Sequence, residues 1–85
     1  SIPFNINAHY LDTDPASTHR GESRKTRIQE FHEFNELSVL GLREGSWLQV
    51  AGNSIVLKGT HKAPLFQKRK ERIDCNSETD FSFLR

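Results

Sequence analysis

Residues 38–57 constrain the fold most strongly, because they contain three short apolar segments separated by two glycine-containing turns. The segments have the length and apolar content of strands, over residues 38–42, 47–50 and 54–57. The first turn, Arg43-Glu44-Gly45-Ser46, is polar and tight, and the second, Gly52-Asn53, is typical of a β-hairpin. The pattern therefore predicts one strand followed by a hairpin.

The N-terminal part of the chain predicts a strand, a loop and a helix in that order. Residues 2–8 alternate apolar with small or polar side chains, which is the period of a strand. Residues 11–20 are rich in Asp, Pro, Ser and Thr, as expected of a loop. A helix is predicted over residues 21–35, and its spacing places three side chains on one face: Arg24, Ile28 and Phe31.

The C-terminal part is less informative. Residues 62–66 predict an edge strand, and the charged tail over residues 67–85 predicts no defined element. The chain has 85 residues, of which 34% are hydrophobic. An ordinary domain has roughly 45–50% apolar residues when glycine is counted. The composition therefore predicts either a thin domain or part of a larger one.

Charge and sequence pattern argue against nucleic-acid and membrane partners. Twelve basic and eleven acidic residues leave a net charge of +1, so no overall field attracts an anionic partner. The basic run over residues 68–72 has acidic neighbours and no accompanying aromatic pattern, which favours a solvated face. No apolar run approaches the ~20 residues that span a bilayer, and residues 1–5 lack the pattern of a signal peptide. Because Ser1 stands where an initiating Met is expected, we expect the chain to begin within a longer protein.

A metal site is not predicted. The candidate ligands His9, His19, His32 and Cys75 lie far apart and form no CxxC or HExxH pair. The single cysteine cannot form an internal disulfide, which fits a reducing cytosolic setting. We expect neither a metal nor another cofactor.

The sequence contains candidates for only part of the machinery of nucleophilic catalysis. His9 at a strand end is a candidate base, and Glu44 at the next strand end is a candidate orienting carboxylate. None of the eight serines stands in a Gly-x-Ser-x-Gly turn, and Cys75 lies in a polar tail. From the residues alone, a structural role for His9 is the stronger interpretation.

Three motifs resemble the C-terminal part of the α-aspartyl dipeptidases, the peptidase E group of serine peptidase family S51, which also contains cyanophycinase. The motifs are Asn7-Ala8-His9-Tyr10, then Thr18-His19-Arg20-Gly21-Glu22-Ser23-Arg24 with Arg27-Ile28, and then the stretch from Gly41 to Val50 with Glu44-Gly45-Ser46-Trp47. The resemblance covers roughly residues 2–58, and the tail beyond about Lys62 has no recognisable motif.

The resemblance implies an α/β fold, namely the C-terminal part of a doubly wound sheet akin to class I glutamine amidotransferase domains, with a terminal β-hairpin. It implies that residues 1–85 are the C-terminal segment of a single peptidase domain. The family's Gly-x-Ser-Ala-Gly nucleophile would lie upstream, so the nucleophilic serine is not in this chain and the chain alone would be inactive. Because the neighbouring strands would be missing, we expect the isolated chain to fold poorly or to aggregate.

The same resemblance implies roles for three residues. His9 matches the general base, Glu44 matches the glutamate that orients it, and Arg24 matches the arginine that pairs with the substrate's aspartate side chain. The implied activity is cytoplasmic hydrolysis of dipeptides with an N-terminal aspartate (Asp-X), with the N-terminal part of the same enzyme as partner. A homodimer is left open.

One departure from the family pattern and two alternatives are relevant. Ala8 stands where bacterial members usually have Pro, which makes the strand end less rigid and leaves the chemistry unchanged. The first alternative is a non-catalytic module that binds aspartate or acidic peptides. The second is a related cyanophycinase-like peptidase.

Overall fold

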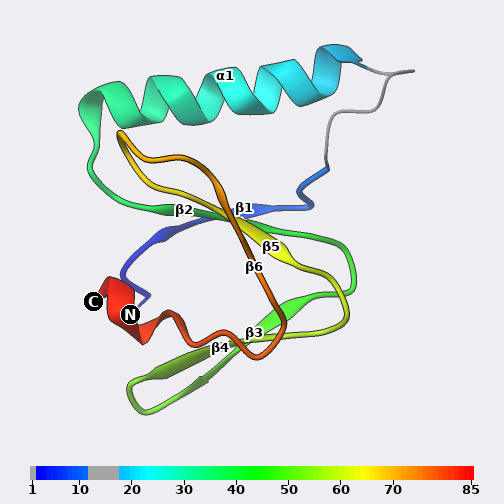
Figure 1. Ribbon diagram of the computed structural model, residues 1–85, viewed down its shortest axis with the longest axis vertical. Helices are drawn as coiled ribbons and strands as arrows, with labels where there is room; N and C mark the ends of the chain where they lie inside the picture. Colours follow the sequence, from blue (N-terminus) through cyan, green and yellow to red (C-terminus); the bar gives the residue numbers. More distant parts are fainter. Residues whose placement is uncertain (1, 12–17) are drawn as a thin grey trace.

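The computed structural model describes residues 2–11 and 18–85, with side chains for residues 2–11 and 24–85. One long helix and six short strands make a mixed α/β structure (Figure 1). The elements are β1 (Asn5–Ala8), α1 (Thr18–Phe34), β2 (Val39–Leu42), β3 (Trp47–Ala51), β4 (Ser54–Lys58), β5 (Ala63–Phe66), β6 (Ile73–Cys75) and the 3-10 helix η1 (Phe81–Leu84).

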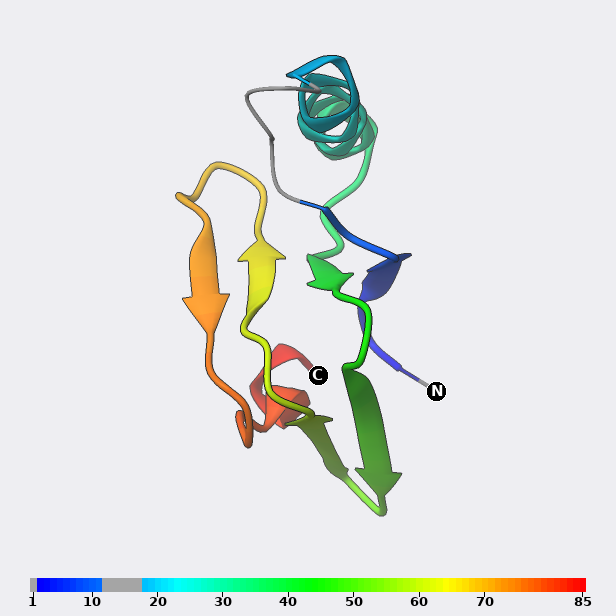
Figure 2. The same cartoon turned by 90° about the vertical axis from the view of Figure 1, so that its right-hand side faces the viewer.

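The elements form three layers around a four-stranded sheet with the order β1-β2-β5-β6. Figures 1 and 2 show α1 on one side of this sheet and the β3–β4 hairpin with η1 on the other. We call these the helix side and the hairpin side. In both views α1 lies apart from the hairpin, so the sheet separates the two layers.

The parallel pairing of β1 with β2 determines which residues meet at the end of the sheet. The register runs from Asn5 opposite Val39 to Ala8 opposite Leu42, and α1 is the crossover between the two strands. A parallel pair needs such a crossover because both strands run in one direction. Residues that follow Ala8 and Leu42 therefore emerge at the same edge of the sheet.

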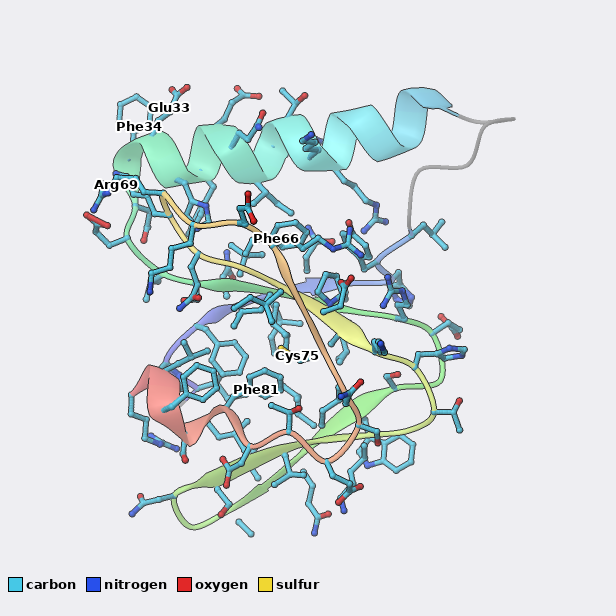
Figure 3. The ribbon with its side chains drawn as sticks, viewed as in Figure 1. Glu33, Phe34, Phe66, Arg69, Cys75 and Phe81 are labelled. Carbon is cyan, nitrogen blue, oxygen red and sulfur yellow. The ribbon has the colours of Figure 1, made fainter. Side chains whose placement is uncertain are left out.

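The hydrophobic core lies on the hairpin side. Its residues come from β2, β4, β5, β6 and η1, together with Phe4 before β1: Phe4, Leu40, Ile55, Leu57, Ala63, Leu65, Cys75 and Phe81. Figure 3 shows Cys75 and Phe81 on this side, whereas Phe66 lies between the sheet and α1. Side chains alternate between the two faces along a strand, which explains why neighbouring residues enter different layers.

Gly41 allows close packing on the helix side. A Cβ atom at this position would lie 2.8 Å from Cγ of Pro64 and 2.9 Å from the ring of Tyr10, closer than carbon atoms pack. The missing side chain therefore lets β5 and the residue after His9 pack directly against β2.

Most of the predicted elements are confirmed, with shifted boundaries. The hairpin over residues 47–58 and the tight turn before it are present, with Ser46 N donating to Arg43 O at 3.1 Å. The helix begins at Thr18 instead of residue 21, so the predicted loop over 11–20 is shorter, and its residues 12–17 lie outside the described part. The first strand begins at Asn5 instead of residue 2.

Two predictions for the C-terminal third were wrong or incomplete. The strand at residues 63–66 is an inner strand between β2 and β6, not an edge strand. Pro64 has no backbone N–H to donate, but the pairing with β2 involves Leu65 and Phe66, and the ring of Pro64 packs against Gly41. The hairpin is also not the end of the fold, since β5, β6 and η1 follow it.

Candidate active site

His9 and Glu44 follow two neighbouring strand ends and contact each other. His9 is the residue after β1, and Glu44 lies in the turn after β2. His9 Nδ1 and Glu44 Oε2 are 3.1 Å apart, although 35 positions separate the residues in the sequence. The parallel register of β1 and β2 explains the contact, because both side chains emerge at the same edge of the sheet.

The backbone holds His9 in an uncommon conformation. Its φ is +54°, in the left-handed region that few residues other than glycine adopt. The next residue returns to the sheet, with Tyr10 N donating to Leu42 O at 3.0 Å. Backbone strain of this kind is often found at functional sites.

The paired side chains are open to solvent. The side chain of His9 is 80% exposed and that of Glu44 is 86% exposed. They border an open hollow of about 200 Å³, whose lining residues come from the ends of β1 and β2 and the following turn: Ala8, His9, Leu42, Arg43, Glu44, Gly45 and Ser46. When Nδ1 donates its proton to the carboxylate, Nε2 is left as a base that can accept a proton from a reactant.

Ser46 lines the same hollow but is not arranged as a nucleophile. Its Oγ atom is buried and has no hydrogen-bond partner in the described part of the chain. A nucleophilic serine needs a hydrogen bond to its base, and no such bond joins Ser46 to His9 here. The hydroxyl lies beside Gly59, where an added Cβ would come within 3.2 Å of it.

Arg24 reaches the same end of β1 from the helix side. Its Nη1 atom donates to Asn7 Oδ1 at 2.7 Å and approaches Ala8 O at 3.4 Å. The structure therefore brings the third predicted site residue next to the strand end that presents His9. A guanidinium held in this way keeps further N–H groups for a planar anion such as a carboxylate.

Four further residues join this region without having been predicted. Asn7 accepts a hydrogen bond from Arg24. Tyr10 is 8% exposed, and the guanidinium groups of Arg24, Arg43 and Arg72 lie near its ring. Asn7 lies two residues before His9 and Tyr10 directly follows it, which is a signal that could have been used. Arg72 lies in the tail, where no pattern indicated contact with the first strand.

Two of the remaining candidate groups, His32 and Cys75, do not line the hollow. The side chain of His19 lies outside the described part, and His32 Nε2 contacts Leu37 O at 2.8 Å after the helix end. Burial, and to a lesser extent Asp74, raises the pKa of the Cys75 thiol, so this thiol is a poor nucleophile. Among the described residues, no group of His, Cys, Asp and Glu could hold a metal ion.

The basic run at residues 68–72 contributes local ion pairs. Arg69 pairs with Glu36 at 3.4 Å and Arg72 pairs with Asp74 at 2.8 Å. These carboxylates offset part of the positive charge. Arg69 is largely exposed, as the predicted solvated face requires, whereas the Arg72 side chain is only 35% exposed and lies near the rings of Tyr10 and Phe66. Within the described part of the chain, no helix combines the length and the apolar character that crossing a membrane requires.

The comparison with known proteins agrees with the motifs. The model of peptidase family S51 matches residues 2–58. Peptidase E of Streptomyces coelicolor is 58% identical over 83 residues, which are 98% of this chain and 34% of that protein. A probable alpha-aspartyl dipeptidase of Drosophila melanogaster is 42% identical over 83 residues, 98% of this chain and 35% of that protein. The chain thus spans about a third of the length of the curated relatives it matches.

Proposed function

This chain belongs to peptidase family S51, and from that premise we propose that it is the C-terminal segment of a serine dipeptidase domain that hydrolyses dipeptides with an N-terminal aspartate. The observation that carries the proposal is the 3.1 Å contact between His9 and Glu44 at adjacent ends of parallel strands. The names of the relatives, peptidase E and probable alpha-aspartyl dipeptidase, support the same reaction.

In this proposal His9 is the general base and Glu44 orients it. The nucleophilic serine comes from sequence N-terminal to residue 1, and its hydroxyl proton passes to His9 Nε2 as the oxygen attacks the carbonyl carbon of the aspartyl residue. The protonated imidazole then gives this proton to the leaving amine as the peptide bond breaks. Water, deprotonated by His9, hydrolyses the resulting ester and releases aspartate. Glu44 stabilises the imidazolium in both halves of the reaction.

Arg24 supplies the preference for aspartate. Asn7 and the Ala8 carbonyl hold its guanidinium beside the strand end. A carboxylate side chain on the substrate gains charge-assisted hydrogen bonds there, which an asparagine side chain does not. Aspartyl and asparaginyl dipeptides have nearly the same shape, so the charge of the side chain is the property by which Arg24 distinguishes them.

The proposal includes a larger sheet. The free edge of β1 would receive further parallel strands from the N-terminal part of the enzyme, as in the doubly wound sheet of class I glutamine amidotransferase domains. The β1-α1-β2 unit is compatible with that arrangement, because it has parallel strands joined by a helix. We further propose a cytoplasmic enzyme that uses no cofactor, in which a homodimer is an additional assembly to test.

The test is turnover of Asp-Ala by the complete protein that contains this chain. We expect His9→Ala to lower kcat/KM about 10⁴-fold, as loss of a triad member does elsewhere. His32→Ala is the matched control, because it removes a histidine that is not at the strand ends. Its kcat/KM should stay within about threefold of the wild-type value. Full activity of His9→Ala would contradict the assigned base. Turnover by residues 1–85 alone would contradict the assignment of the serine to another segment.

A second candidate function is a non-catalytic module that binds aspartate or an acidic peptide. The observation that favours it is the preformed Arg24–Asn7 contact, which needs no nucleophile. Both functions predict that aspartate binds through Arg24, so the Asp-Ala assay separates them: a pure binder binds aspartate in calorimetry and shows no turnover. A cyanophycinase-like peptidase is the remaining alternative, and it would cleave aspartate–arginine polymer in preference to Asp-Ala.

A further inference from the structure

The turn that carries Glu44 is contacted by residues that follow the hairpin. Residues 43–46 form this turn, which we call the Glu44 turn, and Ser46 N donates to Arg43 O at 3.1 Å across it. Gly45 in the turn has a φ of +81°, a conformation that favours glycine. The Glu44 turn therefore has a defined shape, and its position relative to His9 depends on what packs against it.

Gly59, the residue after β4, packs directly on the Glu44 turn. A Cβ atom at Gly59 would lie 2.6 Å from Gly45 O, a distance at which no side chain fits, and 3.0 Å from Cα of Ser46. The φ of Gly59 is +105°, which L side chains rarely adopt. Glycine is the residue that combines this backbone conformation with so close an approach to the turn.

A second contact joins the same segment to the Glu44 turn. The Arg43 guanidinium donates through Nη1 to Lys62 O. Arg43 precedes Glu44, and the two residues that Gly59 approaches follow it. Residues 59–62 therefore contact the turn on both sides of the catalytic carboxylate in the sequence.

Ser77, from the C-terminal tail, holds Gly59 in place. Its Oγ atom donates to Gly59 O at 2.7 Å. Main-chain hydrogen bonds fix this part of the tail beside β4, because Leu57 N donates to Thr79 O at 2.9 Å and Glu78 N donates to Leu57 O at 2.7 Å. Figure 1 shows the tail after β6 passing beside the hairpin. A series of contacts thus runs from Ser77 through Gly59 to the catalytic turn.

We propose that Gly59 and Ser77 position Glu44 for its contact with His9. They are positioning residues, which act through the Glu44 turn and take no part in the proton transfer. The proposal rests on the proposed function for the chemical role of the catalytic pair. Both residues lie beyond residues 2–58, the stretch that matches the family model, so the site extends into the C-terminal part of the chain.

Gly59→Ala in the complete protein is the strongest test. We expect kcat for Asp-Ala to fall about 10²-fold, because a displacement of about 1 Å can cause a loss of this size. KM should stay within about twofold, because the Arg24 guanidinium is held by Asn7 and not by the Glu44 turn. Gly52→Ala is the matched control, since Gly52 also has a positive φ, of +59°, and an added Cβ would meet no atom of the described residues within 4 Å. Its kcat should stay within about threefold of the wild-type value.

Ser77→Ala is a milder variant that tests the same contacts where Gly59→Ala does not fold. Loss of the hydroxyl frees Gly59 O, and we expect kcat to fall about tenfold at unchanged KM. Ser77→Thr keeps the hydroxyl and should retain most of the activity. Thr79→Val is the matched control: it removes a hydroxyl in the same tail that donates to Asn76 O at 2.6 Å, and its kcat should stay within about twofold.

The tautomer of His9 provides a readout that needs no turnover. The hydrogen bond made by one ring nitrogen determines which nitrogen carries the proton, so the contact with Glu44 favours the proton on Nδ1. When Glu44 is displaced, a larger share of the imidazole should carry the proton on Nε2. Nitrogen NMR chemical shifts of the two ring atoms in the complete protein measure this share. We expect it to rise about twofold or more in Gly59→Ala and Ser77→Ala and to stay unchanged in Gly52→Ala and Thr79→Val.

The two readouts distinguish failure of the positioning role from failure of the proposed function. A shifted tautomer in a protein whose wild type does not hydrolyse Asp-Ala would support the positioning role and reject the dipeptidase. The wild-type tautomer in folded Gly59→Ala or folded Ser77→Ala would overturn the positioning role, whatever the change in kcat. Equal changes in the control variants would overturn it as well, because a general loss of stability would then be the cause. Thermal melting identifies the folded variants.

Discussion

The two faces of the four-stranded sheet differ in what they bury. On the hairpin side, Leu40, Ile55, Leu57 and Phe81 are each 0% exposed and form a continuous apolar core. On the helix side, α1 contributes a single buried apolar residue among its described side chains, Ile28, and the space near the strand ends holds polar and cationic groups. The hairpin side buries an apolar core, whereas the helix side combines packed groups such as Tyr10 and Pro64 with charged groups at the strand ends.

This difference indicates how a small structure can carry a charged site. Burial of apolar surface stabilises a fold without directional constraints, at roughly 25 cal/mol per Å², whereas gathered guanidinium groups repel one another and lose hydration. The hairpin side therefore stabilises the register of β1 and β2, and that register places His9 beside Glu44. Substitutions in the core of the hairpin side should therefore affect stability, and substitutions at the ends of β1 and β2 should affect activity.

The largest expected effect is on activity, from Glu44→Gln in the complete protein. The neutral amide cannot stabilise the imidazolium, and it no longer selects the tautomer with a free Nε2, so kcat should fall about 10³–10⁴-fold. The pair is exposed on both sides, so its loss should change stability by less than about 1 kcal/mol. Steady-state kinetics and chemical denaturation measure the two quantities. A stability loss as large as the activity loss would contradict the separation of the faces.

Phe81→Ala should have the largest effect on stability. This side chain is fully buried between η1 and the sheet, with its ring centre 5.8 Å from that of Phe4. Its removal leaves a cavity and should lower the free energy of unfolding by about 3–5 kcal/mol. Phe83, two residues later and 62% exposed, is the matched control, and its change to alanine should cost less than about 1 kcal/mol. Equal losses in the denaturation midpoint would refute the assigned core.

Gly41→Ala should lower the stability and weaken substrate binding at the same time. The added methyl group would meet Pro64 and the ring of Tyr10 at under 3 Å, and such overpacking costs about 1–3 kcal/mol. Because the Arg24 guanidinium lies 5.9 Å from the centre of the Tyr10 ring, KM for Asp-Ala should rise as well. Thermal unfolding and kinetics check the two effects together. A variant with unchanged stability and unchanged KM would show that the packing around Gly41 is looser than described.

The smallest expected effect is the pH dependence contributed by Asp80. Hydrogen bonds from the N–H groups of Ser82 and Ile55 lower the pKa of this carboxyl below its ordinary value of 3.8. The folded state then binds fewer protons than the unfolded state, so the contribution is complete above the ordinary pKa and is lost as the pH falls through the folded value. The melting temperature should fall more steeply below about pH 4 in the wild type than in Asp80→Asn. Parallel curves would contradict this role.

The sequence predicted the parts of the fold that depend on local pattern. Alternation in residues 2–8, the glycine turns at 45 and 52, and the helical face with Ile28 were sufficient to predict β1, the hairpin and α1. The contact between His9 and Glu44 is what two parallel neighbouring strand ends would give. The residues alone favoured a structural role for His9, and the pairing with Glu44 was expected only from the family resemblance.

The remaining features depend on contacts between distant residues. Strand β6 has three residues, too few for a period to be recognised, and it forms because β5 offers a partner. Nothing local distinguishes Phe81 from Phe83. Phe81 is 0% exposed and packs on Phe4 beside the bridge between Val56 and Asp80, whereas Phe83 is 62% exposed. Arg72 reaches Tyr10 across 62 positions of sequence, a contact that requires the complete sheet.

The left-handed backbone at His9 has a consequence for the way this position tolerates change. A φ of +54° suits glycine better than any other residue, so the imidazole is retained there against the preference of the main chain. Replacement by glycine would relax the backbone and leave the open hollow beside Glu44 vacant. Free imidazole from solution could then occupy the place of the side chain, which makes residue 9 a natural position for chemical rescue.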